Sequence, residues 1–287
     1  MNWFVLAIGA AVFASARDLL SKRFGREIDP LLISWALSLF SLPFLGIALC
    51  FASIPTLGPG FAPALLGAGL LLALAWVLYI KALSLSDLSL TIPMMAFNPI
   101  FVLLLAGVSL NEMPSAKGLL GVVLIGLGAF LLSSRRDIRG SLQPFVALRG
   151  EPGPRLMMMV ALLFSAVAVL EKYGIQNASP LFFVVAENAV IALVMAPVVY
   201  LKNRRGFRRT GENWRRLLPV GLLTALMFFC QSTAMRLGPV AYVISVKRTN
   251  ILLGVLAGCL LLGEAGFKGR VLGASVMLLG VVLLCLV

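Results

Sequence analysis

The chain consists of apolar runs divided by short polar or Gly/Pro-containing breaks. Each run holds about 20 residues, enough for one helix to cross the ~30 Å hydrocarbon layer of a bilayer. The pattern predicts ten helices, at residues 2–20, 31–54, 61–80, 88–109, 116–133, 156–174, 180–201, 217–235, 239–262 and 270–287. Only the breaks at 134–155 and 202–216 are long and polar. We therefore expect an all-α membrane protein with ten transmembrane helices.

Composition supports a membrane protein. Of the 287 residues, 61% are hydrophobic and 12% are charged, which is too little polar surface for a soluble fold. The net charge of +13 would suggest nucleic acid as the partner of a soluble protein, but in a membrane protein it favours basic cytoplasmic loops. The partners that we expect are the lipid bilayer and a small-molecule substrate, with no nucleic acid. Both a monomer and a homodimer stay open.

The residue inventory excludes several kinds of chemistry. The chain has no histidine, and its four cysteines lie in apolar runs without a CxxC pair, so neither a metal site nor a disulfide framework is predicted. No G-x-x-x-x-G-K-[ST] motif exists that would bind the phosphates of ATP. We therefore predict no cofactor and no catalytic residues.

The chain repeats itself. A shift of 152 residues matches Asn98 with Asn250, Glu112 with Glu264, Gly121 with Gly273 and Gly128 with Gly280, and a shift of 150 matches Ser15 with Ser165, Lys22 with Lys172 and Pro30 with Pro180. The repeats would be residues 1–134 and 155–287, joined by a cytoplasmic linker at 135–154. Because five helices per repeat is an odd number, the second repeat must be inverted in the membrane, as in secondary transporters.

Loop charges predict the orientation. Alternate loops, beginning with the loop after the first helix, hold 19 Lys and Arg residues, whereas the opposite set holds three: Lys117, Lys172 and Arg236. The positive-inside rule then places both termini outside the cytoplasm. The expected location is a plasma membrane, the inner membrane of a prokaryote.

Each repeat ends in a short motif. Asn111-Glu112 precedes a helix with Gly121, Gly126 and Gly128, and Gly263-Glu264 precedes a helix with Gly273 and Gly280. This pattern resembles the EamA-type drug/metabolite transporter family over nearly the whole chain. The resemblance implies a ten-helix basket of two inverted five-helix units around a central cavity. Family members commonly place both termini in the cytoplasm, whereas the loop charges here predict the reverse.

Three ionisable residues lie deep in apolar runs, where such a side chain costs about 2.5–3.5 kcal/mol. Glu187 and Lys247 fall at similar depths in helices that run in the same direction, so we expect an ion pair that is either a substrate or proton site or a packing device. Lys247, Asn250, Gly254 and Gly258 share one face of a continuous helix. Arg248 is turned by ~100° from Lys247, towards Ser245 or a headgroup-lined crevice, and is either a cavity residue or an anchor.

Further polar and aromatic residues complete the predicted substrate site. Pro93 and Pro99 break the helix around Asn98, the repeat partner of Asn250, and would free backbone carbonyls. Trp76, Tyr79 and Tyr242, with Trp35, would line a cavity, whereas Tyr200 and Trp214 are typical of membrane-interface anchors. Glu171 is the second candidate for proton coupling after Glu187. Glu112 and Glu264 suit the dipoles of the helices that follow them.

The favoured function is a secondary active transporter, an exporter of small organic metabolites with a polar or anionic group facing Lys247. An alternative is translocation of an anionic lipid or lipid-linked carrier. From another class, a membrane-embedded enzyme is disfavoured because no nucleophile–base constellation exists, although Lys247 and Arg248 leave a phosphate-transfer reaction open. A structural subunit is disfavoured because the sequence shows no soluble recognition domain. The sequence leaves open whether transport is proton-coupled.

Overall fold

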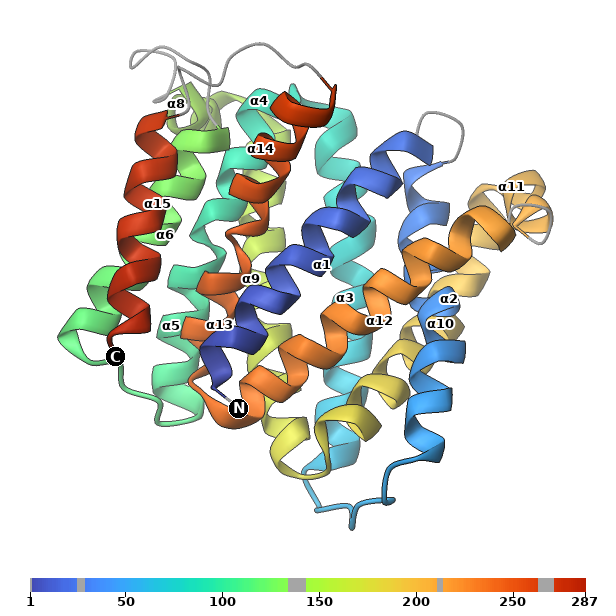
Figure 1. Cartoon of the computed structure of the whole chain (residues 1–287). Helices are drawn as coiled ribbons and strands as arrows, with labels where there is room; N and C mark the ends of the chain where they lie inside the picture. The colour runs from blue at the N-terminus through green and yellow to red at the C-terminus, as the bar shows by residue number, and fades with distance from the viewer. Residues whose placement is uncertain (1, 25–28, 134–142, 211–213, 263–270) are drawn as a thin grey trace. The chain divides into compact units, whose positions relative to one another are not determined.

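The computed structural model describes residues 2–24, 29–133, 143–210, 214–262 and 271–287, and all regular structure within these ranges is helical (Figure 1). The helices before residue 135 are α1 (Trp3–Phe24), α2 (Pro30–Cys50), α3 (Phe61–Leu85), α4 (Leu88–Thr91), the 3₁₀ helix η1 (Ile92–Phe97), α5 (Asn98–Ser109) and α6 (Ala116–Ser133). Those after it are α8 (Gln143–Gly150), α9 (Pro152–Gln176), α10 (Pro180–Lys202), α11 (Arg204–Arg209), α12 (Trp214–Leu237), α13 (Val240–Lys247), α14 (Asn250–Leu262) and α15 (Val271–Cys285). The all-α prediction is confirmed for the described residues.

Seven of the described segments are long and apolar enough to cross a membrane. They are α1, α2, α3, the combined η1–α5 segment, α9, α10 and α12, and shorter apolar helices occur at Ala116–Leu132 and Val271–Cys285. The described chain is therefore that of an integral, multi-pass membrane protein.

Local sequence signals fix where two of these helices begin. Asp29 caps α2 by accepting the Leu31 N–H at 2.8 Å, and Ser179 caps α10 by accepting the Phe182 N–H at 3.3 Å. Each cap is followed at the first helical position by a proline, Pro30 or Pro180, whose missing N–H costs nothing there. The two prolines matched by the internal repeat thus have the same local role.

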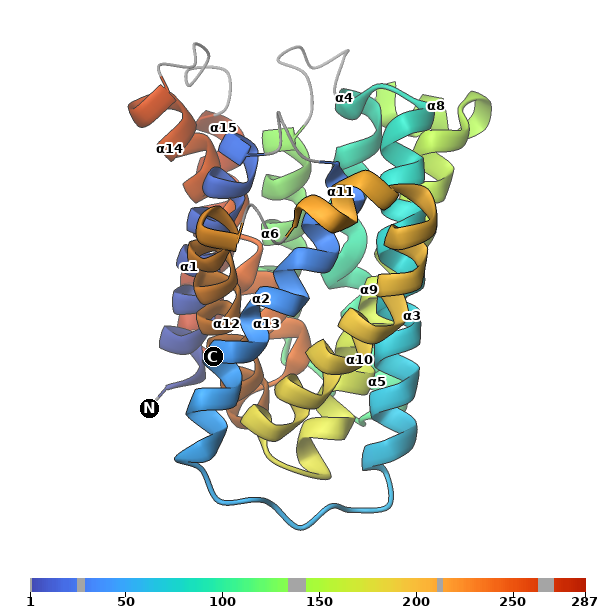
Figure 2. The same ribbon diagram turned by 90° about the vertical axis from the view of Figure 1, so that its right-hand side faces the viewer.

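The chain forms two compact units, and each takes helices from both sequence halves. The first unit holds residues Met1–Trp76 and Leu170–Leu237, and the second holds Val77–Val169 and Gly238–Val287. In the first unit α1 packs on α12, and α2 packs on both α10 and α12. Figures 1 and 2 both draw α2 beside α10. In the second unit the main pairs are α6 with α15, α5 with α13, and α6 with η1.

Glycines set the close contact between α6 and α15. A Cβ on Gly128 would lie 2.6 Å from the Met277 nitrogen, and a Cβ on Gly280 would lie 2.7 Å from the Gly121 carbonyl oxygen. Backbone therefore packs on backbone, which only glycine permits. Because Gly121 lies against Gly280 and Gly128 against Gly273, the two helices run antiparallel.

The two long polar breaks contain helices that the hydropathy pattern did not predict. Part of the predicted linker at 135–154 forms α8, and α9 begins at Pro152 rather than at residue 156. Part of the break at 202–216 forms α11. Both α8 and α11 are short and lack a long apolar run, so a search for membrane spans misses them. Residues 134–142 of the linker and the Gly263-Glu264 motif lie outside the described residues.

Candidate functional site

The helix around Asn98 is interrupted as predicted. Helix α4 ends at Thr91, the 3₁₀ helix η1 covers Ile92–Phe97, and α5 begins at Asn98. Pro93 and Pro99 lie at the start of η1 and α5, where they cannot donate the backbone hydrogen bonds of a continuous α-helix. The interruption places the Asn98 side chain, which is 2% exposed, at the start of a new helix.

A second interruption occurs at the matching position of the other sequence half, where no proline predicts it. Arg248 and Thr249 form a turn between α13, which ends at Lys247, and α14, which begins at Asn250. The Thr249 N–H bonds the Val246 carbonyl at 3.0 Å and the Ile251 N–H bonds the Arg248 carbonyl at 3.1 Å, a three-residue spacing tighter than that of an α-helix. The repeat partners Asn98 and Asn250 thus both begin a helix directly after an interruption.

A buried hydrogen-bond network joins residues next to these two interruptions, within the second unit. The Arg248 Nη2 donates to Asn98 Oδ1 at 2.7 Å, and the Asn98 Nδ2 donates to Ser165 Oγ at 2.8 Å and to the Ala161 carbonyl at 3.2 Å. The Ser165 hydroxyl, fully buried, lies 2.7 Å from the Ala161 carbonyl and 3.0 Å from the Asn98 carbonyl. The network orients a permanently charged guanidinium inside an apolar segment.

This geometry corrects the expectation for the basic helix. The predicted common face of Lys247, Asn250, Gly254 and Gly258 requires a continuous helix, but the turn at Arg248–Thr249 separates Lys247 from the other three. Arg248 contacts Asn98, a partner that its helical position did not indicate, and the Ser245 hydroxyl donates to the Ala241 carbonyl of its own helix at 2.6 Å. The structure therefore brings together the predicted site residues Asn98 and Arg248.

Tyr242 packs at the opposite end of α13 from Arg248. It is buried, and its hydroxyl accepts the Ser115 N–H at 3.1 Å. The same hydroxyl lies against Gly118 at the start of α6, where a Cβ would overlap it. Tyr79, Lys247 and Asn250 are partly buried in the same unit. Their roles as substrate contacts, like that of Tyr242, stay predictions.

The Asn111-Glu112 motif contacts the start of α13. Asn111 adopts a left-handed backbone conformation with φ of 54°, which asparagine and glycine tolerate best. Glu112 Oε2 then accepts the Val240 N–H at 2.8 Å, at the start of a helix whose own cap residue, Pro239, forms no side-chain cap. Glu112 is structural, as expected, but it caps α13, the helix that leads to Lys247 and Arg248.

In the first unit, Glu187 lies in the middle of α10 and is 1% exposed. Its neighbour Asn188 is fully buried, donates to the Val184 carbonyl at 2.9 Å and accepts the Ser41 hydroxyl of α2 at 3.4 Å. Glu187 and Lys247 belong to different compact units, so the proposed ion pair between them stays a prediction. Trp76, also in the first unit, is partly buried.

Glu171 and Lys172 of α9 both bond to α12. Glu171 Oε2 accepts Gln231 Nε2 at 3.1 Å, and the Lys172 ammonium donates to the Met235 carbonyl. In return, Arg236 of α12 donates to the Ile175 carbonyl at 2.8 Å and to that of Ala178 at 3.1 Å. Lys172 and Arg236, two of the three basic residues in the loop set with few positive charges, thus bond to carbonyl groups at helix C-termini, where cations are favourable.

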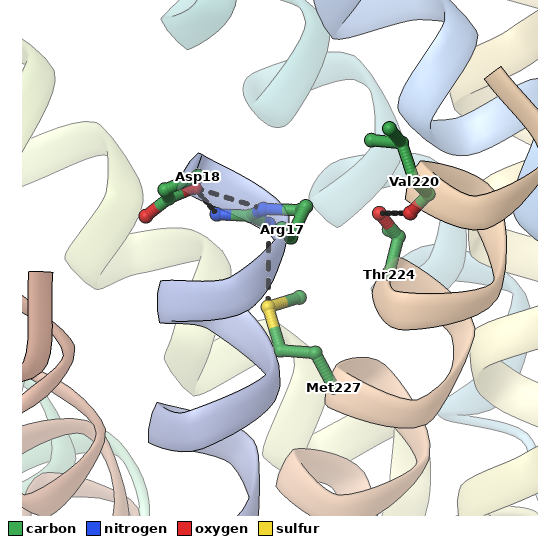
Figure 3. Close-up of polar contacts among 5 residues, drawn as sticks. All are labelled: Arg17, Asp18, Val220, Thr224 and Met227. Atoms are coloured by element: carbon green, nitrogen blue, oxygen red, sulfur yellow. Dashed lines mark hydrogen bonds and ion pairs between the residues drawn. The ribbon is translucent and has the colours of Figure 1, made fainter. Parts of the chain in front are cut away.

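Another charged pair, on α1 of the first unit, has a packing role. Arg17 donates to Asp18 at 2.7 Å and to the Met227 sulfur of α12 at 3.2 Å, and Figure 3 draws both contacts. Thr224, one turn earlier in α12, donates to the Val220 carbonyl of its own helix at 2.7 Å. Arg17 therefore joins α1 to α12. Trp35, for which the sequence predicts a place in a cavity wall, is buried and donates to the Ala192 carbonyl at 2.9 Å.

Sequence reasoning missed Ser165, Asn188 and Gln231 as members of these polar clusters. The available signal was an isolated polar residue within an apolar run, and for Ser165 also its repeat partner, Ser15. A serine in a helix commonly bonds only its own backbone, so position alone could not single out Ser165.

The family comparison matches both halves of the chain. A model of the EamA-like transporter family matches residues 1–134 and again residues 152–286. The chain is also similar to a solved structure described as "Crystal structure of protein", with a TM-score of 0.76 and 16% sequence identity, over 98% of this chain and 95% of that chain. That likeness concerns the fold alone. No curated protein matches the chain.

Proposed function

Since the chain belongs to the EamA-like transporter family, we propose that it is a secondary active transporter that exports small organic metabolites by alternating access. The proposed substrates carry a polar or anionic group, which Lys247 and Arg248 contact. Asn98, Asn250, Tyr79, Tyr242 and Trp76 are the further proposed substrate contacts. The sequence holds no ATP-binding motif, which supports transport driven by a gradient and not by ATP bound to this chain.

The bond between Arg248 and Asn98 carries this proposal. Interrupted helices in an apolar segment expose backbone groups that need polar partners, and secondary transporters use such places to bind substrate. Here Arg248 and Asn98 lie beside two interruptions, and the Arg248 Nη2 donates to Asn98 Oδ1 at 2.7 Å. The Arg248 guanidinium is permanently charged. A charged residue at this depth is costly and is most often functional. The planar guanidinium also suits a carboxylate or phosphate group.

We further propose ten membrane spans in two inverted repeats, residues 1–134 and 155–287, with the linker 135–154 between them. The contact of α6 with α15 supports the inversion. These helices occupy matching positions in the two repeats, since Gly121 matches Gly273 and Gly128 matches Gly280. They nevertheless run antiparallel, because Gly121 lies against Gly280 and Gly128 against Gly273. The loop charges support termini outside the cytoplasm, in a plasma membrane. Glu187 is the first candidate for proton coupling, and Glu171 is the second.

A metabolite comparison tests the proposal. Cells that express the wild-type chain, the Arg248→Gln variant or an empty vector would be compared for metabolites in medium and cytoplasm. We expect an anionic compound to accumulate in the medium with the wild-type chain and to return to the empty-vector level with Arg248→Gln. Lys81→Gln, which removes an exposed charge from α3, is the matched control. Equal profiles for the wild-type chain and the empty vector would refute export.

A further inference from the structure

The segment between α10 and α12 is rich in arginine, and part of it forms the short helix α11. Residues 202–216 contain six arginines and Lys202. In α11, Phe207 stacks on Trp35 of α2 at 4.8 Å between ring centres and meets the edge of Tyr200 of α10 at 5.5 Å. These rings attach α11 to the ends of two apolar helices.

Polar contacts hold the start of α11 in the same place. Asn203 caps α11 by accepting the Gly206 N–H at 2.8 Å, and its Nδ2 donates to Asp29 Oδ2 at 3.3 Å. Asp29 in turn caps α2. Helix α11 is thus connected to α2 through both an aromatic stack and a hydrogen bond from Asn203.

Two arginines of this segment lie on aromatic rings. Arg204 donates from Nε to the Tyr200 hydroxyl at 2.7 Å, with its guanidinium 4.9 Å from the centre of the Tyr200 ring. The Arg215 guanidinium lies 5.4 Å from the centre of the Trp214 ring. Among the described residues, no acceptor holds the two terminal nitrogens of Arg204, and both arginines are exposed. Such a held guanidinium fork matches the geometry of a phosphate group.

The position of the segment identifies the partner. Helix α10 ends at Lys202 and α12 begins at Trp214, so Arg204 lies just after one apolar helix and Arg215 at the start of another, at the level where lipid headgroups lie. Tyr200 is partly buried and Trp214 is exposed. Tyrosine and tryptophan rings are typical of this level, and clusters of arginines beside a membrane helix attract anionic lipids. We propose that Arg204 and Arg215, held on Tyr200 and Trp214, form a binding surface for the phosphate groups of anionic phospholipids. This inference does not depend on the transported substrate.

Lipid titration tests this surface. The purified full chain in a neutral detergent would be titrated with dioctanoyl phosphatidylglycerol or dioctanoyl phosphatidylcholine, and bound lipid counted by native mass spectrometry. We expect the wild-type chain to prefer phosphatidylglycerol, and the Arg204→Gln/Arg215→Gln variant to bind it on the order of 30-fold more weakly, because each basic residue near the surface contributes about a fivefold change in affinity.

Control variants distinguish binding at this surface from non-specific electrostatic attraction between the anionic lipid and the basic chain. Lys81→Gln/Arg149→Gln removes two exposed charges elsewhere and should leave the affinity for phosphatidylglycerol unchanged. Arg204→Lys/Arg215→Lys keeps the charge, should stay folded, and should bind with intermediate affinity. Equal weakening in the Lys81/Arg149 control, or wild-type affinity in the glutamine variant, would overturn the proposal. Displacement of phosphatidylglycerol by an equal concentration of glycerol 3-phosphate would also overturn it, in favour of a site for free phosphate esters.

Discussion

Asn111 links a family motif to a backbone conformation. Its left-handed φ of 54° turns the chain so that Glu112 reaches the first N–H of α13. We expect Asn111→Gly to keep the thermal unfolding midpoint of the purified protein, whereas Asn111→Val should lower the stability by about 1–2 kcal/mol, because a β-branched residue tolerates this conformation poorly. Equal midpoints for the glycine and valine variants would show that the conformation carries no such cost.

Glu187 gives a prediction for proton coupling. The Glu187→Gln variant keeps the shape of a side chain that is 1% exposed but cannot titrate. We expect this variant to fold and to bind substrate, while its transport loses any dependence on a pH gradient. Transport would be measured in liposomes with and without an imposed gradient. Unchanged gradient dependence would assign coupling elsewhere, and Glu171→Gln would then be the next variant to measure.

At the scale of single residues, the sequence showed which polar groups lie in apolar runs, but it did not show their hydrogen-bond partners. The free-energy cost of burying a charge in an apolar run indicated that Arg248 needs a polar partner. Its contact with Asn98 depends on how residues 150 positions apart pack, which no local pattern encodes. Ser165 was missed because its hydroxyl also bonds the Ala161 carbonyl one turn earlier, as an ordinary helical serine would.

The helix pair α6–α15 gives a prediction at the scale of elements. A Cβ on Gly128 would lie 2.6 Å from the Met277 backbone nitrogen, which cannot rotate away. Gly128→Ala should therefore destabilise the protein by about 1–3 kcal/mol. Gly46→Ala, in α2, has nothing within 4 Å of its new Cβ, so it should be neutral or stabilise by up to about 1 kcal/mol. Thermal unfolding in one detergent compares them, and similar losses in both variants would contradict the predicted packing.

Elements were predictable where their cause is local. The prolines at 93 and 99 predicted the break before α5 because proline cannot continue a helix. The break before α14 has no such residue, so the apolar run at 239–262 by itself predicts one continuous helix. The internal repeat already held the missing signal, since Asn250 is matched with Asn98.

The loop charges give a prediction for the membrane topology of the whole molecule. Since 19 basic residues lie in one set of loops and three in the other, a reporter active only in the cytoplasm should be active within the Lys202–Arg216 loop and silent after Val287. The bonds of Lys172 and Arg236 to helix-end carbonyls strengthen this expectation, because they account locally for two of the three exceptions. An active reporter after Val287 would restore the orientation that is common in the family.

The organisation of the whole molecule was only partly predictable. The repeat and the family resemblance divided the chain at its middle, and the family match covers the same two halves. The compact units instead combine Met1–Trp76 with Leu170–Leu237 and Val77–Val169 with Gly238–Val287. Sequence similarity records which segments are alike, whereas compact units depend on which apolar faces pack together.

The central claim is that Arg248, held by Asn98, contacts an anionic group of the transported substrate. The most direct measurement is uptake, into liposomes containing the purified chain, of the compound that the metabolite comparison identifies. Arg248→Gln should raise KM by about 10-fold to 100-fold, since a charge-assisted hydrogen bond is lost, and Arg248→Lys should recover part of that loss. Wild-type KM and rate in Arg248→Gln would contradict the claim.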